Sequence, residues 1–373
     1  MESEKEFLAG FEEHFNEIED PRQQSKISHP LMEILFLAIT AVAGRAGSWE
    51  SIELFGKLQL EVLRSYYPFS SGIPSKHTIR RVFEVIKPNQ MNGILLKYFG
   101  QNLSPGHIAI DGKSIRGSKH EEFRALHFLN VYAASSGLTI CGSALDKKQN
   151  EISAIPEVLD CLELAGSIVT IDAIGCQKTI AKQIIDKKAD YILGLKKNHV
   201  ALQSEVEKAF SSDAVEFFTM DLFETHEKGH GRHESRKCRV IRDIAKIAGS
   251  DKWPGLQSVI EVHRHVVEKD KVSESINYYI SSSTNSAEAM LQNIRSHWKI
   301  ESMHWMLDVV FNEDRSKVHK DHSPANIAII RRFVLNILNL MKGKNQSRPN
   351  LMKAISWFGE YLNKFINTLT IYS

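Results

Sequence analysis

Ile108-Ala109-Ile110-Asp111-Gly112 is the stretch that decides the fold, because a short apolar run that stops at an acidic residue and a glycine is typical of a buried strand ending at a ligand site. Ile168-Val169-Thr170-Ile171-Asp172 repeats the arrangement further along the chain. A single aspartate at the end of a strand usually caps only the following turn. Two of them in one sheet favour a pair of carboxylates in the crevice at the carboxyl ends of the strands.

The pattern around these two stretches predicts three strands, followed by helix, strand, helix and strand. The elements are the strands 108–110, 128–134 and 138–145, a helix over 152–164, the strand 168–171, a helix over 177–187 and the strand 191–195. Since the first three strands follow one another through short turns, we expect an antiparallel meander. The whole order is that of a ribonuclease H-like sheet with helices on both faces, so the predicted fold class is α/β.

A chain of 373 residues is long enough for two or three domains. The predicted organisation is a helical N-terminal domain (1–105), the first part of a ribonuclease H-like core (106–199), a separate β-rich insertion (200–285), the last part of the core with a long helix (286–342) and a helical C-terminal tail (343–373). The tail has the pattern of a packing helix or a dimer helix.

Composition and charge exclude several classes of protein. The 47 Lys and Arg against 45 Asp and Glu leave a net charge of +2, so any basic surface must arise from uneven distribution. The longest apolar run, 34–44, is far short of the roughly 20 residues of a membrane span, and the acidic N-terminus is unlike a signal peptide. The four cysteines are too far apart for a Cys-x-x-Cys pair, so we expect buried, reduced thiols. These features predict a cytoplasmic protein with no membrane association.

The N-terminal segment has the pattern of three short helices, the second following Ser48 and the third beginning near Ser75 or Thr78. The third carries Arg80, Arg81 and Lys87 among apolar residues. Two readings remain open: a helix-turn-helix-like unit that binds DNA, or a small helical bundle with a charged outer face.

A third carboxylate follows from helical spacing after the N-cap Ser286. Counting from Ile294 along one helix gives a single stripe that contains Ile294, Trp298, Glu301, Trp305 and Asp308. This stripe predicts that Glu301 faces inward beside two tryptophans, where it needs a metal or an ion-pair partner. A polar edge lies next to the stripe and consists of His297, Glu301, His304 and Asp308. Core packing is the favoured role of the tryptophans, and stacking on an unpaired base is the alternative.

Three converging carboxylates without a cysteine or histidine trio favour a hard, oxygen-preferring cation, Mg²⁺ or Mn²⁺. Two such ions serve in-line displacement at phosphorus. The predicted substrate is therefore a nucleic acid.

A second histidine-rich span contains His226, His230 and His233. A metal site, contact with the DNA backbone and plain exposed surface are all compatible with it, and the glycines between the histidines favour DNA contact.

Several longer motifs resemble one family. They are Ile110-Asp111-Gly112-Lys113-Ser114-Ile115-Arg116-Gly117-Ser118, Lys148-Gln149-Asn150-Glu151-Ile152, Thr170-Ile171-Asp172-Ala173-Ile174-Gly175-Cys176-Gln177, Asp190-Tyr191-Ile192-Leu193-Gly194-Leu195-Lys196-Lys197-Asn198, His230-Gly231-Arg232-His233-Glu234-Ser235-Arg236 and His297-Trp298-Lys299-Ile300-Glu301. In this order they resemble the H-repeat-associated family of DDE-type insertion-sequence transposases, over residues 20 to 340.

The resemblance implies a catalytic and metal-binding triad of Asp111, Asp172 and Glu301. In related transposases a Tyr, an Arg and a Lys accompany the last Glu, whereas this chain has Ile294, His297 and Asp308 at those positions. We expect four other residues to take the place of those basic residues in holding DNA: Lys196, Arg295, His297 and His304. The DNA-binding residues predicted from the motifs and basic segments are Arg80, Arg81, Lys87, Lys113, Arg116, Lys196, Arg232, Arg236, Arg295, His297 and Trp298.

The function that follows from this resemblance is a DNA transposase. It binds the inverted ends of an insertion sequence, cleaves the phosphodiester and transfers the 3′-OH strand to target DNA, using two Mg²⁺ or Mn²⁺ ions. We expect a homodimer in the complex with double-stranded DNA, associated with the nucleoid. A metal-dependent nuclease without strand transfer and a catalytically retired DNA-binding protein are the alternatives.

Overall fold

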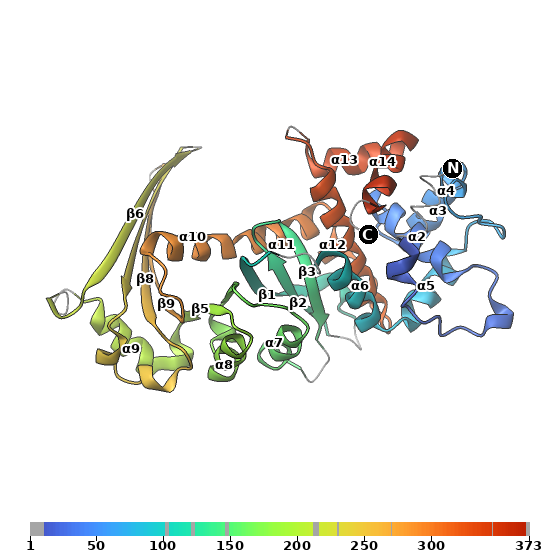
Figure 1. Ribbon diagram of the computed structural model, residues 1–373. Coiled ribbons are helices and arrows are strands. Elements are labelled where there is room, and N and C mark those ends of the chain that lie inside the picture. Colours follow the sequence, from blue (N-terminus) through green and yellow to red (C-terminus); the bar gives the residue numbers. More distant parts are fainter. Residues whose placement is uncertain are drawn as a thin grey trace.

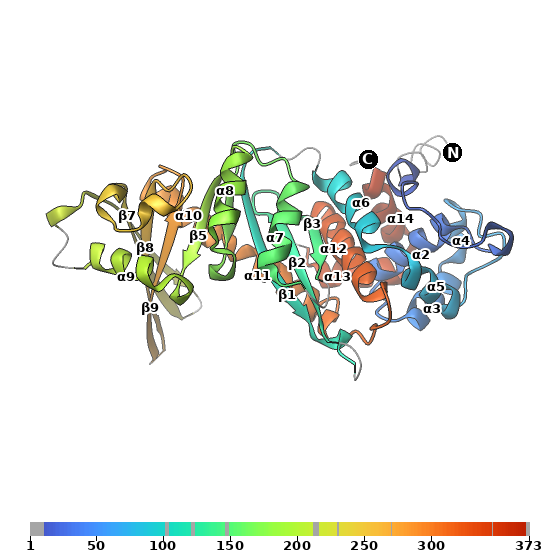
Figure 2. The same cartoon turned by 90° about the horizontal axis from the view of Figure 1, so that it is seen from below.

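A computed structural model describes residues 11–100, 104–120, 124–145, 149–211, 216–229, 231–269, 271–344 and 346–370. The molecule is elongated. The N-terminal and C-terminal helices form one end, an α/β core lies in the middle, and a β-sheet arm forms the other end (Figures 1 and 2).

Five strands form the core sheet, and their order confirms the predicted one. They are β1 (His107–Ile115), β2 (Leu126–Ala133), β3 (Leu138–Ala144), β4 (Ile168–Ile171) and β5 (Asp190–Leu195), arranged β3-β2-β1-β4-β5. The first three are antiparallel, whereas β1, β4 and β5 run parallel. The helices α7 (Glu151–Asp160) and α8 (Lys178–Asp186) cover one face, and α10 (Ala287–His297) and α11 (Lys299–Val309) cover the other (Figure 1).

Register brings the two predicted aspartates to one place. Ile110 of β1 pairs in parallel with Ile171 of β4, so Asp111 and Asp172 follow at the same level of the sheet. The prediction that the first strand stops at Asp111 is wrong, because β1 continues to Ile115 along its antiparallel partner β2. Of the two strands that lead to the aspartates, only β4 ends where the sequence pattern predicted.

The β-rich segment extends the core sheet instead of forming a sheet of its own. After α9 (Val200–Ala209) it consists of β6 (Met220–Gly229), β7 (Arg232–Ile241), β8 (Ser258–Glu268) and β9 (Lys271–Ser281), and β9 pairs antiparallel with β5. The nine described strands therefore form one continuous sheet. We call the segment from β6 to β9 the arm (residues 220–281). The hairpin of β6 and β7 was not predicted, because its exposed strands are rich in charged residues on both faces.

Helices at the N-terminus form the opposite end of the molecule. They are α2 (Leu31–Ala43), α3 (Trp49–Leu58), α4 (Leu60–Arg64), α5 (Lys76–Val85) and α6 (Pro88–Gly100). Ser48 and Ser75 cap α3 and α5, as predicted. The connection between α3 and α5 contains α4 and is longer than the three- to four-residue turn of a helix-turn-helix, so DNA binding by this end stays a prediction.

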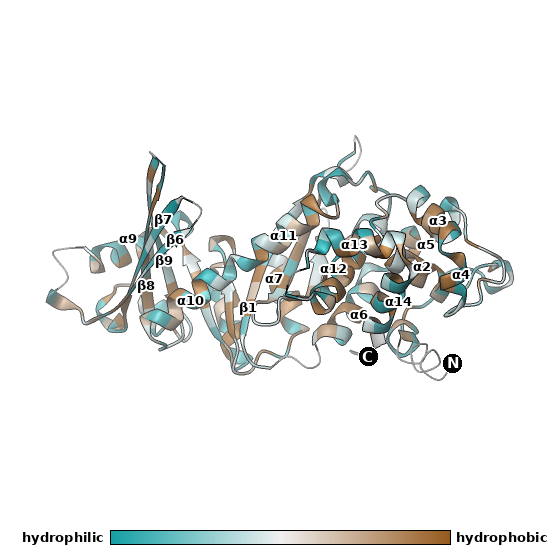
Figure 3. Cartoon of the chain, turned by 90° about the horizontal axis from the view of Figure 1, so that it is seen from above, coloured by the Kyte–Doolittle hydropathy of each residue, from teal (hydrophilic) through white to brown (hydrophobic). Residues whose placement is uncertain are grey.

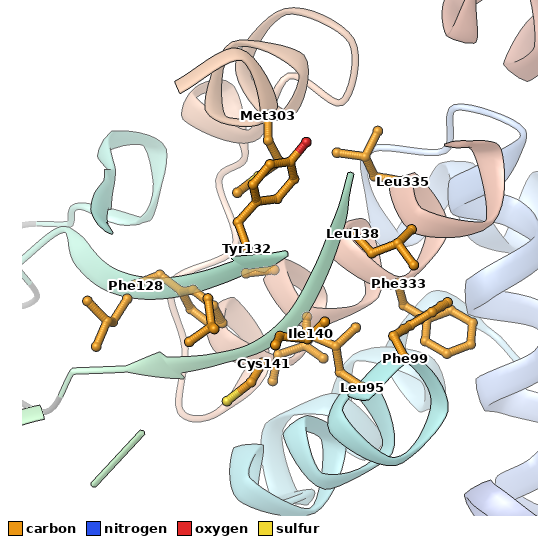
Figure 4. Packing of buried hydrophobic residues seen from close by; sticks show 14 of the residues in the cluster. Leu95, Phe99, Phe128, Tyr132, Leu138, Ile140, Cys141, Met303, Phe333 and Leu335 are labelled. Atoms are coloured by element: carbon orange, nitrogen blue, oxygen red, sulfur yellow. The ribbon is translucent and has the colours of Figure 1, made fainter. Parts of the chain in front are cut away.

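The long helix α12 (Ser323–Met341) joins this helical end to the sheet. It is buried on nearly every side, and its residues Phe333 and Leu335 pack with side chains of β2, β3 and α6 (Figure 4). The tail forms α13 (Arg348–Trp357) and α14 (Gly359–Thr370), which pack on α2 and α12. Figure 3 shows the apolar character of these helices. Within the described chain the tail is thus a packing element of the same core.

Burial corrects one further expectation, that of four buried cysteines. Cys141, Cys176 and Cys238 are buried, as predicted, but Cys161 is exposed at the end of α7. Across the described residues, no helix is both long enough and apolar enough to cross a bilayer.

A buried ion pair lies at the centre of α12. Arg332 is 0% exposed, its Nη1 lies 2.9 Å from Glu313 Oε1, and its guanidinium stacks 4.1 Å from the ring centre of Phe128. Arg331 is also buried and lies 3.8 Å from the same carboxylate. Both arginines are enclosed because α12 has no solvent-facing side at this level.

Glu313→Gln should lower the free energy of unfolding by about 3–5 kcal/mol, since it leaves buried guanidinium charge without a counter-ion. Urea denaturation of the full chain measures the change. Asp186→Asn removes an exposed ion pair with Lys182 and should change stability by less than about 1 kcal/mol. Equal effects of the two substitutions would contradict a central role for the buried pair.

Candidate active site

A cavity of about 270 Å³ lies where β1, β4, β5 and β9 meet α10 and α11. All three predicted carboxylates, Asp111, Asp172 and Glu301, line it. Of the predicted DNA-binding residues, Lys196, His297 and Trp298 line it as well. The cavity therefore brings together the whole predicted triad and three of the predicted DNA-binding residues.

Each carboxylate is held by a different element. Asp111 lies within β1, opposite Asn130 of β2. Asp172 directly follows β4, and its Oδ1 accepts a hydrogen bond from the backbone N–H of Ile174 at 3.0 Å. Glu301 lies in the first turn of α11 and is exposed at the mouth of the cavity.

The acidic groups repel one another. Burial, together with the carboxylates of Asp172, Glu151 and Glu301, raises the pKa of Asp111 to about 7. Burial also raises the pKa of Asp172, although the N–H of Ile174 opposes the change. The site thus concentrates negative charge that a cation would neutralise.

Glu151 is a site residue that the sequence analysis did not assign. It begins α7, and its Oε1 lies 2.5 Å from His127 Nε2, while Ser114 Oγ lies 2.9 Å from His127 Nδ1. A Cβ on Gly112 would lie 2.3 Å from Glu151 Oε1, so the glycine after Asp111 is needed for this pair to lie over β1. The Glu151 motif was visible in the sequence, but only the fold shows that it reaches the aspartates.

The predicted stripe around Glu301 is wrong. Trp298 is 52% and Trp305 is 58% exposed, so neither tryptophan packs in the core. The buried positions of α11 are Ile300, Met303 and Leu307. The physical reason is that α10 ends at His297 and α11 begins at Lys299, with Trp298 between them, so a count that starts at Ile294 does not carry across the break.

Three members of the predicted polar edge, His297, His304 and Asp308, face the sheet, whereas Glu301 is exposed. Thr170 Oγ1 lies 2.9 Å from His297 Nδ1 and 2.7 Å from His107 Nε2. His304 Nε2 lies 3.0 Å from the amide nitrogen of Asn130.

The two histidines of this edge are not cations. Burial lowers the pKa of His297 to about 4. Burial, with Arg332 and Lys113 nearby, lowers the pKa of His304 to about 3. Both rings are therefore neutral near pH 7, and their role as substitutes for the basic residues of related transposases stays a prediction.

Lys113 is not available to DNA. Only 7% of its side chain is exposed, and its Nζ lies 2.6 Å from Asp308, 3.3 Å from Asp314 and 3.5 Å from Glu313. The predicted DNA-binding role of Lys113 is replaced by a structural one, because three carboxylates enclose its ammonium group.

The other predicted basic residues lie away from the cavity. Arg81 and Lys87 are exposed at the helical end, where Arg80 pairs with Glu84, and Arg116 is 85% exposed beyond β1. The predicted DNA-binding arginines of the arm and of α10 form ion pairs with glutamates. Arg232 and Arg236 contact Glu234, and Arg295 contacts Glu227 at 2.6 Å.

The histidine-rich span does not form a cluster in the described residues. His226 and His233 are exposed on β6 and β7, and His230 lies outside the described residues. More generally, in the ranges that the structure describes, no three His, Cys, Asp or Glu are already arranged as a metal site. The acids around the cavity nevertheless offer the oxygen donors that Mg²⁺ and Mn²⁺ prefer.

Comparison with known proteins identifies two family models in this chain. The model described as "Transposase DDE domain" matches residues 102–337, and the one described as "DDE_Tnp_1-associated" matches residues 12–99. The "Putative transposase YncI" of Escherichia coli O157:H7 is 38% identical over 336 residues, covering 87% of this chain and 86% of that protein. The "H repeat-associated putative transposase YhhI" of Escherichia coli K12 is 36% identical over 338 residues, covering 87% and 89%.

A solved structure is also similar. The cryo-EM structure of the piggyBac transposase synaptic complex with hairpin DNA aligns at a TM-score of 0.47 and 12% identity, covering 96% of this chain and 81% of that one.

The raised pKa of Asp111 has a consequence for stability. An aspartate in the unfolded chain has a pKa of about 3.9, so above that pH and up to about 7 the folded protein binds more protons than the unfolded one. Stability therefore falls as the pH rises through this window. Without divalent metal, Asp111→Asn should raise the melting temperature more at pH 8 than at pH 5.

Thermal unfolding in EDTA at the two pH values measures this difference. Added Mn²⁺ should stabilise the wild-type protein more than the variant and so reduce the difference at pH 8. Asp186→Asn, an exposed carboxylate, is the control. The same stabilisation by Asp111→Asn at both pH values would show that Asp111 is not held under charge repulsion.

Proposed function

This chain belongs to the H-repeat-associated family of DDE transposases, and from that membership and the acidic cavity we propose that it cleaves the ends of its insertion sequence and joins the freed 3′-OH strand to target DNA. The observation that carries the proposal is the meeting of Asp111, Asp172 and Glu301 around one cavity. Three separate elements supply these acids, which lie far apart in the sequence.

The arrangement of β1 to β5 supports a ribonuclease H-like catalytic core. Three antiparallel strands are followed by two parallel ones, in the order β3-β2-β1-β4-β5. The arm is then an insertion between β5 and the helix that carries Glu301, and the helices before β1 form an end-binding domain. These domain assignments are part of the proposal.

Asp111, Asp172 and Glu301 would hold Mg²⁺ or Mn²⁺, in a pair of ions. When bound, the ions activate the attacking oxygen and stabilise the leaving one in displacement at phosphorus. The raised pKa of Asp111 and the donor set of oxygens alone support this fit. Because hydrolysis and joining are both in-line displacements, one set of acids serves both steps.

Neighbouring side chains would place the DNA. The exposed Lys196 lines the cavity and attracts a phosphate. His297 is neutral and donates a hydrogen bond instead of a charge. Trp298 is half exposed at the same cavity, a position suited to stacking on an unpaired base. Arg232 and Arg236 would bind the DNA backbone along the arm, in a homodimer that holds two ends.

Asp111→Asn, Asp172→Asn and Glu301→Gln should each reduce cleavage of end DNA by at least about 1000-fold, because each removes metal-binding charge at the reacting phosphate. Band-shift assays should show end binding within a few-fold of wild type. The matched control Glu163→Gln lies on the exposed loop after α7 and should cleave normally. Cleavage near the wild-type rate in any one of the three variants would remove that residue from the triad.

Strand transfer separates a transposase from a nuclease. An oligonucleotide that ends in the element's exposed 3′-OH, mixed with the protein, Mg²⁺ and plasmid, should become covalently joined to the plasmid, since the pre-cut end bypasses hydrolysis. Gel analysis of labelled oligonucleotide measures the joining, which Glu301→Gln should abolish.

The two alternatives predict different results in this assay. A nuclease cleaves intact ends but never joins pre-cut ones. A retired transposase binds the ends and does neither. Either result would overturn the proposed strand transfer.

A further inference from the structure

A chain of polar contacts, of which the first two are hydrogen bonds, runs from the buried Arg332 to the carboxylate of Asp111. It passes through Asn130 of β2 and His304 of α11. In each link the donor and the acceptor can be assigned, because the guanidinium of Arg332 at the start of the chain donates hydrogen bonds and cannot accept them. The inference rests on the proposed function in one respect: it takes Asp111 as a metal-binding carboxylate.

The first link starts from a fixed donor. Arg332 is 0% exposed, and its Nη1 donates to Glu313 Oε1 and to the carbonyl oxygen of Ala328, both at 2.9 Å. Its Nε donates to Asn130 Oδ1 at 2.5 Å. A guanidinium has no acceptor, so this contact identifies the oxygen of the Asn130 amide.

The second link is determined independently. The Nδ2 of Asn130 donates to the carbonyl oxygen of Phe128 at 3.2 Å and also lies 3.0 Å from His304 Nε2. An amide nitrogen only donates, and the Phe128 carbonyl only accepts. Both sides of the amide therefore agree on its orientation, and His304 Nε2 has to be the acceptor.

The third link follows from the tautomer. With Nε2 accepting, the single ring proton of the neutral His304 is on Nδ1. Nδ1 lies 3.7 Å from Asp111 Oδ2. This is beyond hydrogen-bond length, but contacts of catalytic groups often close only in the loaded site.

We propose that Arg332, Asn130 and His304 are positioning residues that direct the Nδ1–H of His304 at Asp111 Oδ2 and so orient this carboxylate for metal binding. Residues that orient a metal ligand typically change metal affinity by about 10- to 100-fold when they are lost. The relay also explains why two residues of β1 and β2 that pair directly, Asp111 and Asn130, belong to the same site.

Binding of Mn²⁺ to the full chain tests the relay without any DNA. His304→Phe keeps a ring and removes the donor, so isothermal titration calorimetry should show a Kd weakened about 10- to 100-fold. His304→Asn places an amide N–H near the position of Nδ1, so its Kd should stay within a few-fold of wild type. His14→Phe is the matched control, since His14 is a buried histidine of the helical end whose ring nitrogens have no hydrogen-bond partner in the described structure.

The results decide between positioning and packing. A wild-type Kd in His304→Phe, or an equal loss in His304→Phe and His304→Asn, would overturn the relay. If His304→Phe does not fold, the ¹⁵N NMR signals of the histidine rings in the wild-type protein, assigned with His304→Asn, decide the matter. Protonated Nδ1 with unprotonated Nε2 is expected, and protonated Nε2 would overturn the proposal.

Failure of this inference differs from failure of the proposed function. A wrong tautomer leaves DNA cleavage and joining by the wild-type protein intact. Loss of cleavage and joining in the wild-type protein, with the expected tautomer and Mn²⁺ affinities, would reject only the transposase activity.

Discussion

The buried charge of Arg332 is the constraint on which the rest of the structure depends. A guanidinium that cannot reach water needs acceptors and a counter-ion, and here Glu313, Asn130 and the backbone of α12 accept hydrogen bonds from its Nε and Nη1. Because these partners come from the segment after α11, from β2 and from α12, the single charge fixes the helical end against the sheet. One of these partners, Asn130 of β2, lies directly opposite Asp111, which lines the cavity.

Local patterns in the sequence predicted what local physics determines. The apolar run that ends just before Asp172, and the helix starts after Ser48, Ser75 and Ser286, depend on neighbouring residues and were predicted correctly. Parallel pairing then places both aspartates at one level. The order of the core elements could therefore be predicted from the sequence alone.

Features that depend on distant partners could not be predicted. Trp298 and Trp305 are exposed because a new helix begins after Trp298. The face of α11 that packs on the sheet carries Ile300, Met303 and Leu307 instead. A lysine is normally found at the protein surface, yet three carboxylates from α11 and the segment after it enclose Lys113. Glu151 reaches the aspartates only through the packing of α7 over Gly112.

The continuity of the sheet links the arm to the cavity. Asn277, Tyr278 and Tyr279 line the cavity, and they belong to β9, which pairs with β5 on one side and with β8 on the other. A strand that is hydrogen-bonded on both sides cannot shift without its neighbours. The part of the cavity wall that Tyr278 and Tyr279 form is therefore continuous with the arm through hydrogen-bonded strands on both sides.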